Sequence, residues 1–298
     1  MDFRSLLDRL GPEISDPEEE TFLLYSQDIP SQNLGFVDPQ ATTLDLNVAG
    51  KDYVIYQSPT ILNRPGSTTG AVIWKITPVV ADWLAASENP LWTSGILSSS
   101  SDVLELGCGI SGLVGLVLAP LVARYTLTDQ SYVAKLVEKN IDENNHLINP
   151  KQTKATSQKR KAKPSAAYPK AELRFVPLDW ELDEVTPSLT GSDKVKSFDL
   201  VVACDCIYND TLIQPLVQTC ADVCKLRISD ENGADRPAVC LVAQQLRDPE
   251  IFESWIKEFN KYFRTWRIPD NALSEGLRSN PGFVVHLGIL RDAAETRN

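Results

Sequence analysis

Two stretches of alternating apolar and polar residues stand near the start of the chain. Residues 43–48 and 53–57 alternate in this way on either side of Ala49-Gly50-Lys51-Asp52, which predicts a β-hairpin. Apolar residues then recur at helical spacing over residues 73–84, where Pro78 is tolerable only in a first turn. The pattern therefore predicts a hairpin and a helix ahead of the rest of the chain.

Beyond residue 100, short apolar runs alternate with helical patterns. The runs predict strands at residues 102–106, 125–128, 173–178, 199–203, 239–244 and 283–290. The helical patterns cover residues 112–118, 133–141, 212–226 and 250–263. Asp248 opens the last of these as N-cap, with Pro249 in the first position. This alternation predicts an α/β fold with a doubly wound parallel sheet and a ligand crevice at the carboxyl ends of the strands.

Charge is unevenly distributed along the chain. The 298 residues hold 29 Lys and Arg against 40 Asp and Glu, a net charge of −11 that argues against a non-specific polyanion binder. Residues 151–170 contain seven of the cations and no acid, and we interpret them as a disordered insertion. Its basic core suits nuclear import or an RNA contact, although a solvated loop is the commoner meaning of such a run. The remaining acidic body suits a basic partner.

The first 20 residues contain seven acids and two arginines, which favours a helix start or a solvated lead-in over core. They show no signal peptide pattern, and the longest apolar run is too short for a membrane span. The six cysteines lie mostly in apolar runs without the spacing of a disulfide framework. We therefore expect a protein of a reducing compartment, in the cytoplasm and also in the nucleus, with no membrane partner.

A glycine-rich loop follows the strand at residues 102–106. Gly107-Cys108-Gly109-Ile110-Ser111-Gly112 matches the dinucleotide-type fingerprint between a strand and a helix, where glycines permit a tight turn and close approach of a ligand. Asp129 lies 22 residues after Gly107, at the end of the next strand, where a carboxylate can accept both ribose hydroxyls. The combination predicts an adenosine-containing cofactor. The alternative is a sharp turn with no ligand.

Glu105 distinguishes between adenosine cofactors. A nicotinamide-binding strand usually carries an aliphatic residue two positions before the first glycine, whereas a carboxylate here suits a ligand with an ammonium group. S-adenosylmethionine carries an α-amino group and a sulfonium, and the faces of Trp74 and Trp180 would add cation–π attraction. Each tryptophan could instead be an ordinary core residue.

Five motifs in order resemble one known family. They are TGAVIW (69–74), VLELGCG (103–109), LTD (127–129), LDW (178–180) and DCIY (205–208). The chain resembles the non-SET, seven-β-strand protein lysine methyltransferases, methyltransferase family 16, over roughly residues 70–290. The resemblance implies a Rossmann-like, mostly parallel, seven-stranded sheet in a methyltransferase domain at residues 69–298. Residues 1–68 would then form an amino-terminal extension containing the hairpin.

The resemblance also implies site residues. The positions that would lie along S-adenosylmethionine are Trp74, Glu105, Gly107, Cys108, Gly109, Asp129, Asp179, Trp180 and Ala203. Glu105 and the glycine loop would line the methionine end, Asp129 would hold the ribose, and residues 179–180 with Ala203 would flank the adenine. The family's D-x-x-Y motif is met by Asp205 and Tyr208. The insertion at 151–170 departs from the family core, and Cys204 and Cys206 have no assigned role.

Methyl transfer to an amine requires alignment of nucleophile, methyl carbon and sulfur, and it requires the lysine to be neutral. An apolar channel lowers the pKa of a lysine from about 10.4, while a carboxylate such as Asp205 opposes that shift but orients the amine and can relay its proton. Tyr208 can accept a hydrogen bond and wall the channel. The alternative for this pair is a helix cap with a packed tyrosine.

Other constellations are weaker. Cys220 and Cys224 share one helical face, but His146 and His286 are too far away in the sequence to complete a zinc site, so we predict no metal.

By resemblance, the acceptor is a lysine of a large-subunit ribosomal protein. Another protein lysine, as in an elongation factor or chaperone, a nicotinamide-dependent oxidoreductase and a catalytically silent binding module remain alternatives. The sequence is silent on oligomeric state.

Overall fold

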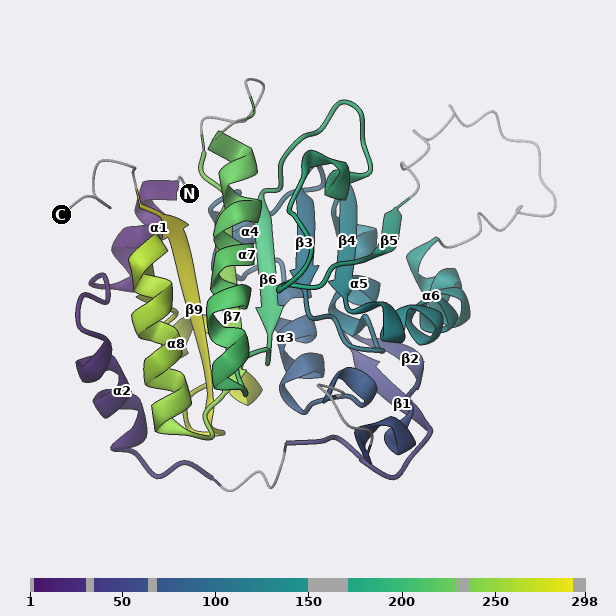
Figure 1. Cartoon of the computed structure of the whole chain (residues 1–298), viewed down its shortest axis with the longest axis horizontal. Helices are drawn as coiled ribbons and strands as arrows, with labels where there is room; N and C mark the ends of the chain where they lie inside the picture. Colours follow the sequence, from purple (N-terminus) through teal and green to yellow (C-terminus); the bar gives the residue numbers. More distant parts are fainter. Residues whose placement is uncertain are drawn as a thin grey trace, which may run out of the picture.

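A seven-stranded sheet with helices on both faces forms the centre of the chain (Figure 1). The computed structural model describes residues 3–30, 35–63, 69–149, 171–228, 230 and 236–291. The strands of the sheet are β3 (Asp102–Leu106), β4 (Arg124–Asp129), β5 (Glu172–Pro177), β6 (Leu200–Cys204), β7 (Val239–Gln245), β8 (Phe263–Arg267) and β9 (Phe283–Leu290). The helices are α1 (Phe3–Leu10), α2 (Pro17–Tyr25), α3 (Ile76–Ala85), α4 (Pro90–Thr93), α5 (Leu113–Leu118), α6 (Ala134–Ile148), α7 (Asp210–Ile228) and α8 (Pro249–Tyr262).

The strand order β5-β4-β3-β6-β7-β9-β8 confirms the predicted doubly wound fold. Strands β3 to β7 run parallel to one another, while β9 runs antiparallel between β7 and β8. Strand β3 lies between β4 and β6, so the winding reverses there. Ligands bind open α/β sheets at the carboxyl ends of strands beside such a reversal, because the two connecting loops diverge and leave a crevice.

Each face of the sheet has its own apolar core. The core on one face contains side chains of α3, α5 and the hairpin, and the core on the other contains side chains of α7 and α8. Figure 1 shows α7 and α8 in front of the sheet and α3 and α5 behind it. Strands β3, β6 and β7 are buried along their whole length, and their sequences are mostly apolar. The polar residues within them are Asp102 and Glu105 of β3 and Gln244 and Gln245 of β7.

The predicted strands at 102–106 and 283–290 are confirmed to the residue, and the sheet has the expected seven strands. The sequence pattern located six of them and missed β8. This strand follows α8 with no intervening residue, and its sequence FRTWR carries two arginines at the sheet edge, so neither a turn nor alternation marks it. The helix predicted at 133–141 extends to Ile148 in α6.

The acidic amino terminus is more than a solvated lead-in, which corrects one part of that prediction. Asp16 caps α2 by accepting hydrogen bonds from two backbone amides of its first turn. Leu6, Leu10 and Leu24 are buried, and Glu20 is buried beside His286 of β9. The apolar residues of this segment are few, which is why its sequence suggests a solvated stretch. Its helices α1 and α2 nevertheless pack against β8 and α8.

The hairpin of β1 (Thr43–Val48) and β2 (Lys51–Tyr56) lies against α6. Asn140 pairs its side-chain amide with the backbone N–H and C=O of Tyr56 at 2.8 and 2.9 Å, and Asn144 does the same with Val54 at 3.0 and 2.9 Å. These two side chains act as the neighbouring strand that β2 lacks on that edge. The predicted insertion at 151–170 lies outside the described residues. Within the described ranges, no helix has the length and apolar character that crossing a membrane requires.

Candidate active site

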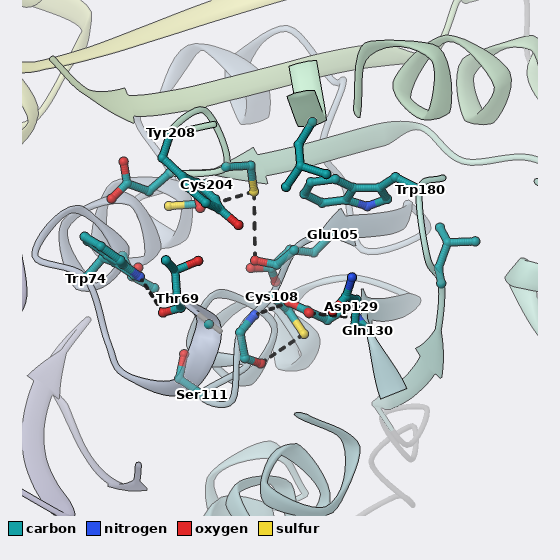
Figure 2. A pocket seen from close by; sticks show the side chains of 18 of the residues that line it. Thr69, Trp74, Glu105, Cys108, Ser111, Asp129, Gln130, Trp180, Cys204 and Tyr208 are labelled. Atoms are coloured by element: carbon teal, nitrogen blue, oxygen red, sulfur yellow. Dashed lines mark hydrogen bonds between the residues drawn. The ribbon is translucent and has the colours of Figure 1, made fainter. Parts of the chain in front are cut away.

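A cleft opens at the carboxyl ends of β3, β4 and β6, where the winding of the sheet reverses. Four loops and strand ends supply its lining: residues 69–77, 105–111, 129–132 and 204–208, with 178–181 closing one side. Figure 2 shows Trp74 and Trp180 on opposite sides, with Glu105 and Asp129 between them and Tyr208 with Cys204 along one wall. The cleft therefore lies where the sequence pattern predicted it.

The glycine loop packs too closely on its neighbours for side chains. Gly107 and Gly109 have φ values of +69° and +59°, a region that favours glycine. A Cβ at Gly107 would lie 2.7 Å from Cys206 Sγ, and one at Gly109 would lie 3.1 Å from the carbonyl oxygen of Gly70. The backbone here thus forms an open floor to the cleft, and residue 70 of the upstream motif lies directly against it.

Asp129 ends β4 and points its carboxylate at this floor. Its Oδ2 accepts a hydrogen bond from Gly109 N at 2.8 Å, and its Oδ1 accepts one from Gln130 N at 2.7 Å. Burial raises the pKa of Asp129 to about 6, although these two amide hydrogen bonds oppose the rise. Each oxygen retains a second lone pair, so the carboxylate can still accept hydrogen bonds from a diol.

Glu105 lies deeper, inside β3, with 2 % of its surface exposed. Burial raises its pKa to about 8, although the hydrogen bond from the Tyr125 hydroxyl opposes the rise. The nearby charge of Asp129 adds to the increase. Glu105 is therefore largely protonated at neutral pH in the absence of a cation, and a ligand ammonium would favour its ionised form.

The two tryptophans differ in their surroundings. Trp74 packs against Phe36 with ring centroids 4.5 Å apart and the ring planes tilted by 48°, and the guanidinium carbon of Arg247 lies 4.9 Å from the ring centroid of Trp74. The cation over this ring is thus a residue of the protein, and the contact with a sulfonium that we expected of Trp74 stays a prediction. Trp180 has a buried Nε1 with no hydrogen-bond partner in the described part of the chain.

Asp205 begins the D-x-x-Y segment directly after β6 and adopts φ +58°, a conformation rare outside glycine. Its carboxylate faces Arg247, with Nη1 2.7 Å from Oδ1 and Nη2 2.6 Å from Oδ2. Gln245 N donates a further hydrogen bond to Oδ1 at 3.2 Å. The sequence did not predict this arginine as part of the site. Its one signal is that Arg247 follows the carboxyl end of β7, the next strand along the same edge.

Three thiols line the cleft beside these groups. Burial raises the pKa of Cys108, Cys204 and Cys206 well above the ordinary value, and neighbouring carboxylates add to the effect. All three are therefore protonated and unreactive as nucleophiles. Cys206 Sγ lies 3.3 Å from the carbonyl oxygen of Leu106 and packs beneath the glycine loop, so its role is to fill space in the floor of the cleft.

Ten of the eleven predicted site residues line this one cleft: Trp74, Glu105, Gly107, Cys108, Gly109, Asp129, Asp179, Trp180, Asp205 and Tyr208. Ala203 does not line the cleft; it is fully buried within β6, paired with Leu106 of β3. Side chains alternate along a strand, and Cys204 is the residue of β6 that reaches the cleft.

Comparisons with known proteins agree with this geometry. The lysine methyltransferase family matches residues 57–229, more than half of the chain. A ribosomal lysine N-methyltransferase 5 of Vanderwaltozyma polyspora is 26 % identical over 86 % of this chain and 92 % of its own length. The enzyme of the same name from Zygosaccharomyces rouxii is 29 % identical over 69 % of this chain and 70 % of its own.

A longer relative carries a different name. A diaminohydroxyphosphoribosylamino-pyrimidine deaminase of Schizosaccharomyces pombe is 29 % identical over 84 % of this chain. This chain spans about half of that protein, 52 % of its length, and the deaminase name applies to the longer protein.

The residues of the cleft fit S-adenosylmethionine, the methyl donor expected from the sequence. The glycine floor admits close approach, Asp129 offers free lone pairs, and Glu105 favours a cation. The family match confirms the predicted reaction class and replaces the nicotinamide alternative. The family match, the topology of the sheet and the residues that line the cleft agree with one another, and the chain belongs to the lysine methyltransferase family.

Proposed function

We propose that this protein methylates a lysine of a ribosomal protein, with S-adenosylmethionine as methyl donor. The family match over residues 57–229 is the observation that supports lysine methylation, and the names of the fungal relatives support a ribosomal protein as acceptor. The net charge of −11 agrees with a basic acceptor, because opposite charge speeds encounter.

The chain's own residues would hold the donor along the floor of the cleft. Asp129 would accept hydrogen bonds from the ribose hydroxyls, Glu105 would face the α-amino group, and Asp179 with Trp180 would flank the adenine. When bound, S-adenosylmethionine supplies a methyl carbon activated by its sulfonium. Asp205 and Tyr208 would then lie on the wall along which the acceptor lysine enters.

The transfer balances without another reactant. With the donor bound, the lone pair of a neutral lysine nitrogen would form the new N–C bond. The S–C bond would break at the same time, and the electron pair of the broken bond would stay on sulfur. The nitrogen then releases a proton to solvent. Positioning supplies most of the acceleration in such an in-line displacement, so a rigid cleft wall is what the reaction needs.

Transfer of radiolabelled methyl groups tests the proposal. The acceptor would be salt-washed ribosomes from cells that lack this protein, followed by mass spectrometry of lysine residues. We expect label on a ribosomal protein with the wild type, strong loss with Asp205→Asn, and no change with the matched variant Asp210→Asn, whose residue is exposed at the start of α7. If a whole-cell fraction shows label only on a protein outside the ribosome, the proposal of a ribosomal acceptor is wrong and that protein is the acceptor.

A further inference from the structure

Arg247 is fixed between the cofactor cleft and the amino-terminal extension. Its guanidinium makes a two-point ion pair with Asp205, and Nη2 also donates to Gln245 Oε1 at 3.0 Å. The aspartate side chain is 1 % exposed and the arginine side chain 25 %, so solvent screens the pair weakly. Planar fork geometry of this kind fixes both partners in orientation.

The aromatic wall and the extension hold the same guanidinium from other sides. Trp74 lies beneath it, with the ring centroid 4.9 Å from the guanidinium carbon. A Cβ at Gly35 would lie 2.9 Å from Nη2 of Arg247 and 2.2 Å from Gln245 Oε1, so the extension passes in direct contact. Backbone hydrogen bonds from Lys75 N to Gly35 O and from Val37 N to Ile73 O fasten that segment to the residues on either side of Trp74.

The ion pair changes what Asp205 can do to an incoming amine. A lone carboxylate within about 4–6 Å of an ammonium raises its pKa by about 1–3 units, which would keep the lysine protonated and non-nucleophilic. Paired with Arg247, the carboxylate can still accept a hydrogen bond but has little net charge toward the cleft. The charged and titratable side chains around the pair include Cys204, Cys206, Tyr208, Glu105 and Asp129 on the side of the cleft, and Tyr25 and Asp248 beside Arg247. The thiols and Glu105 are largely protonated at neutral pH, and Arg247 is the cation that offsets the charge of Asp205.

We propose that Arg247 is a positioning residue of the methyl transfer, which neutralises Asp205 so that the carboxylate orients the acceptor amine without retaining its proton. The inference rests on the proposed function, because it assumes that a lysine enters beside Asp205. It assigns to the Asp205–Arg247 pair one role, orientation of an amine that must arrive uncharged.

Single-turnover methyl transfer at saturating S-adenosylmethionine, measured from pH 6 to 10 on salt-washed ribosomes from cells lacking this protein, tests the inference. We expect Arg247→Met to lower the rate at pH 7 about tenfold or more and to move the rising limb of the pH profile upward by about one unit or more. Arg247→Lys keeps the charge and loses the fork, so its rate should fall with the limb unmoved. The double variant Asp205→Asn/Arg247→Met removes both charges and should return the limb to its wild-type position.

Arg264→Met is the matched control. Arg264 also pairs with a carboxylate, Glu13 Oε2 at 2.8 Å, and also lies over a tryptophan, Trp266, but away from the cleft. Its pH profile should equal that of the wild type. A uniform loss of rate in Arg247→Met with no shift of the limb would overturn the inference, as would a shifted limb in Arg247→Lys, in Arg264→Met or in the double variant. Failure of the wild type itself to methylate ribosomal lysines would instead refute the proposed function.

Discussion

The hydroxyl of Tyr125 on β4 donates a hydrogen bond of 2.9 Å to Oε2 of Glu105 on β3, and both residues are buried in the sheet. Burial outweighs this hydrogen bond and a further one from the backbone of Gly115, so the pKa of Glu105 is raised to about 8. In the unfolded chain the same group ionises near pH 4.5. The folded state thus binds the proton more strongly, and its contribution to stability is present below pH 4.5 and is lost as the pH rises through 8.

Glu105 should make cofactor binding depend on pH. A bound ammonium favours the ionised carboxylate, so binding of S-adenosylmethionine at pH 7 should release a proton, and affinity should rise by up to about tenfold per pH unit until pH 8. Titration calorimetry in buffers of different ionisation enthalpy measures both quantities. Glu105→Gln should bind more weakly and flatten the dependence, while Glu172→Gln, an exposed glutamate on β5, should match the wild type. Proton uptake instead of release would contradict this assignment.

Asp129 should contribute to cofactor affinity through its free lone pairs. Asp129→Asn keeps the size of the side chain and one acceptor for the amides of Gly109 and Gln130, but it loses the charged acceptor at the cleft. Hydrogen bonds to a charged group contribute about 1.5–3 kcal/mol, so the dissociation constant for S-adenosylmethionine should rise roughly 10- to 100-fold. Fluorescence or calorimetric titration checks this. The exposed Asp142→Asn on α6 serves as control, and equal affinities of the two variants would exclude Asp129 from the site.

Local signals predicted the cofactor side of the cleft and could not predict the opposite wall. The strand, glycine loop and Asp129 are encoded within 28 consecutive residues, 102–129, and each has one physical reason for its identity. The Asp205–Arg247 pair joins residues 42 positions apart and depends on β6 pairing with β7, which no local pattern states. The sequence also did not show that Cys204 rather than Ala203 lines the cleft, because the face on which a strand residue lies depends on where the strand ends.

The buried polar residues outside the site were also hidden from the sequence. Asn140 and Asn144 look like solvated positions on α6, yet they are 0 % and 1 % exposed because the hairpin covers them. Glu20 stands in an acidic run that suggests solvent, and its partner His286 is 266 positions away. A polar residue gains a buried role only from the segment that folds over it, and composition does not carry that information.

Glu20 should stabilise the docked amino terminus in a pH-dependent manner. Burial alone would raise the pKa of Glu20, but the hydrogen bond and charge of His286, together with Arg267, outweigh it and hold the pKa below 4.5. The group therefore contributes stability above pH 4.5 that is lost as the pH falls. Thermal unfolding should show a lower Tm for Glu20→Gln at pH 7 and a smaller difference from the wild type at pH 4. Glu19→Gln, an exposed neighbour on α2, should show no such difference at either pH.

Asn144 should anchor the hairpin to helix α6. Asn144→Ala removes both hydrogen bonds to Val54. The backbone N–H and C=O of Val54 then lose these partners in a part-buried position. An unsatisfied buried polar group costs about 1–3 kcal/mol, so urea unfolding should give a free energy lower by about that amount, with faster amide hydrogen exchange along β2. Asn145→Ala is the matched control, since its side chain is exposed one position along the same helix. Alanine is the better helix former at either position, so helix propensity alone would raise the stability of both variants, and equal losses in the two would contradict the role of the hairpin contact.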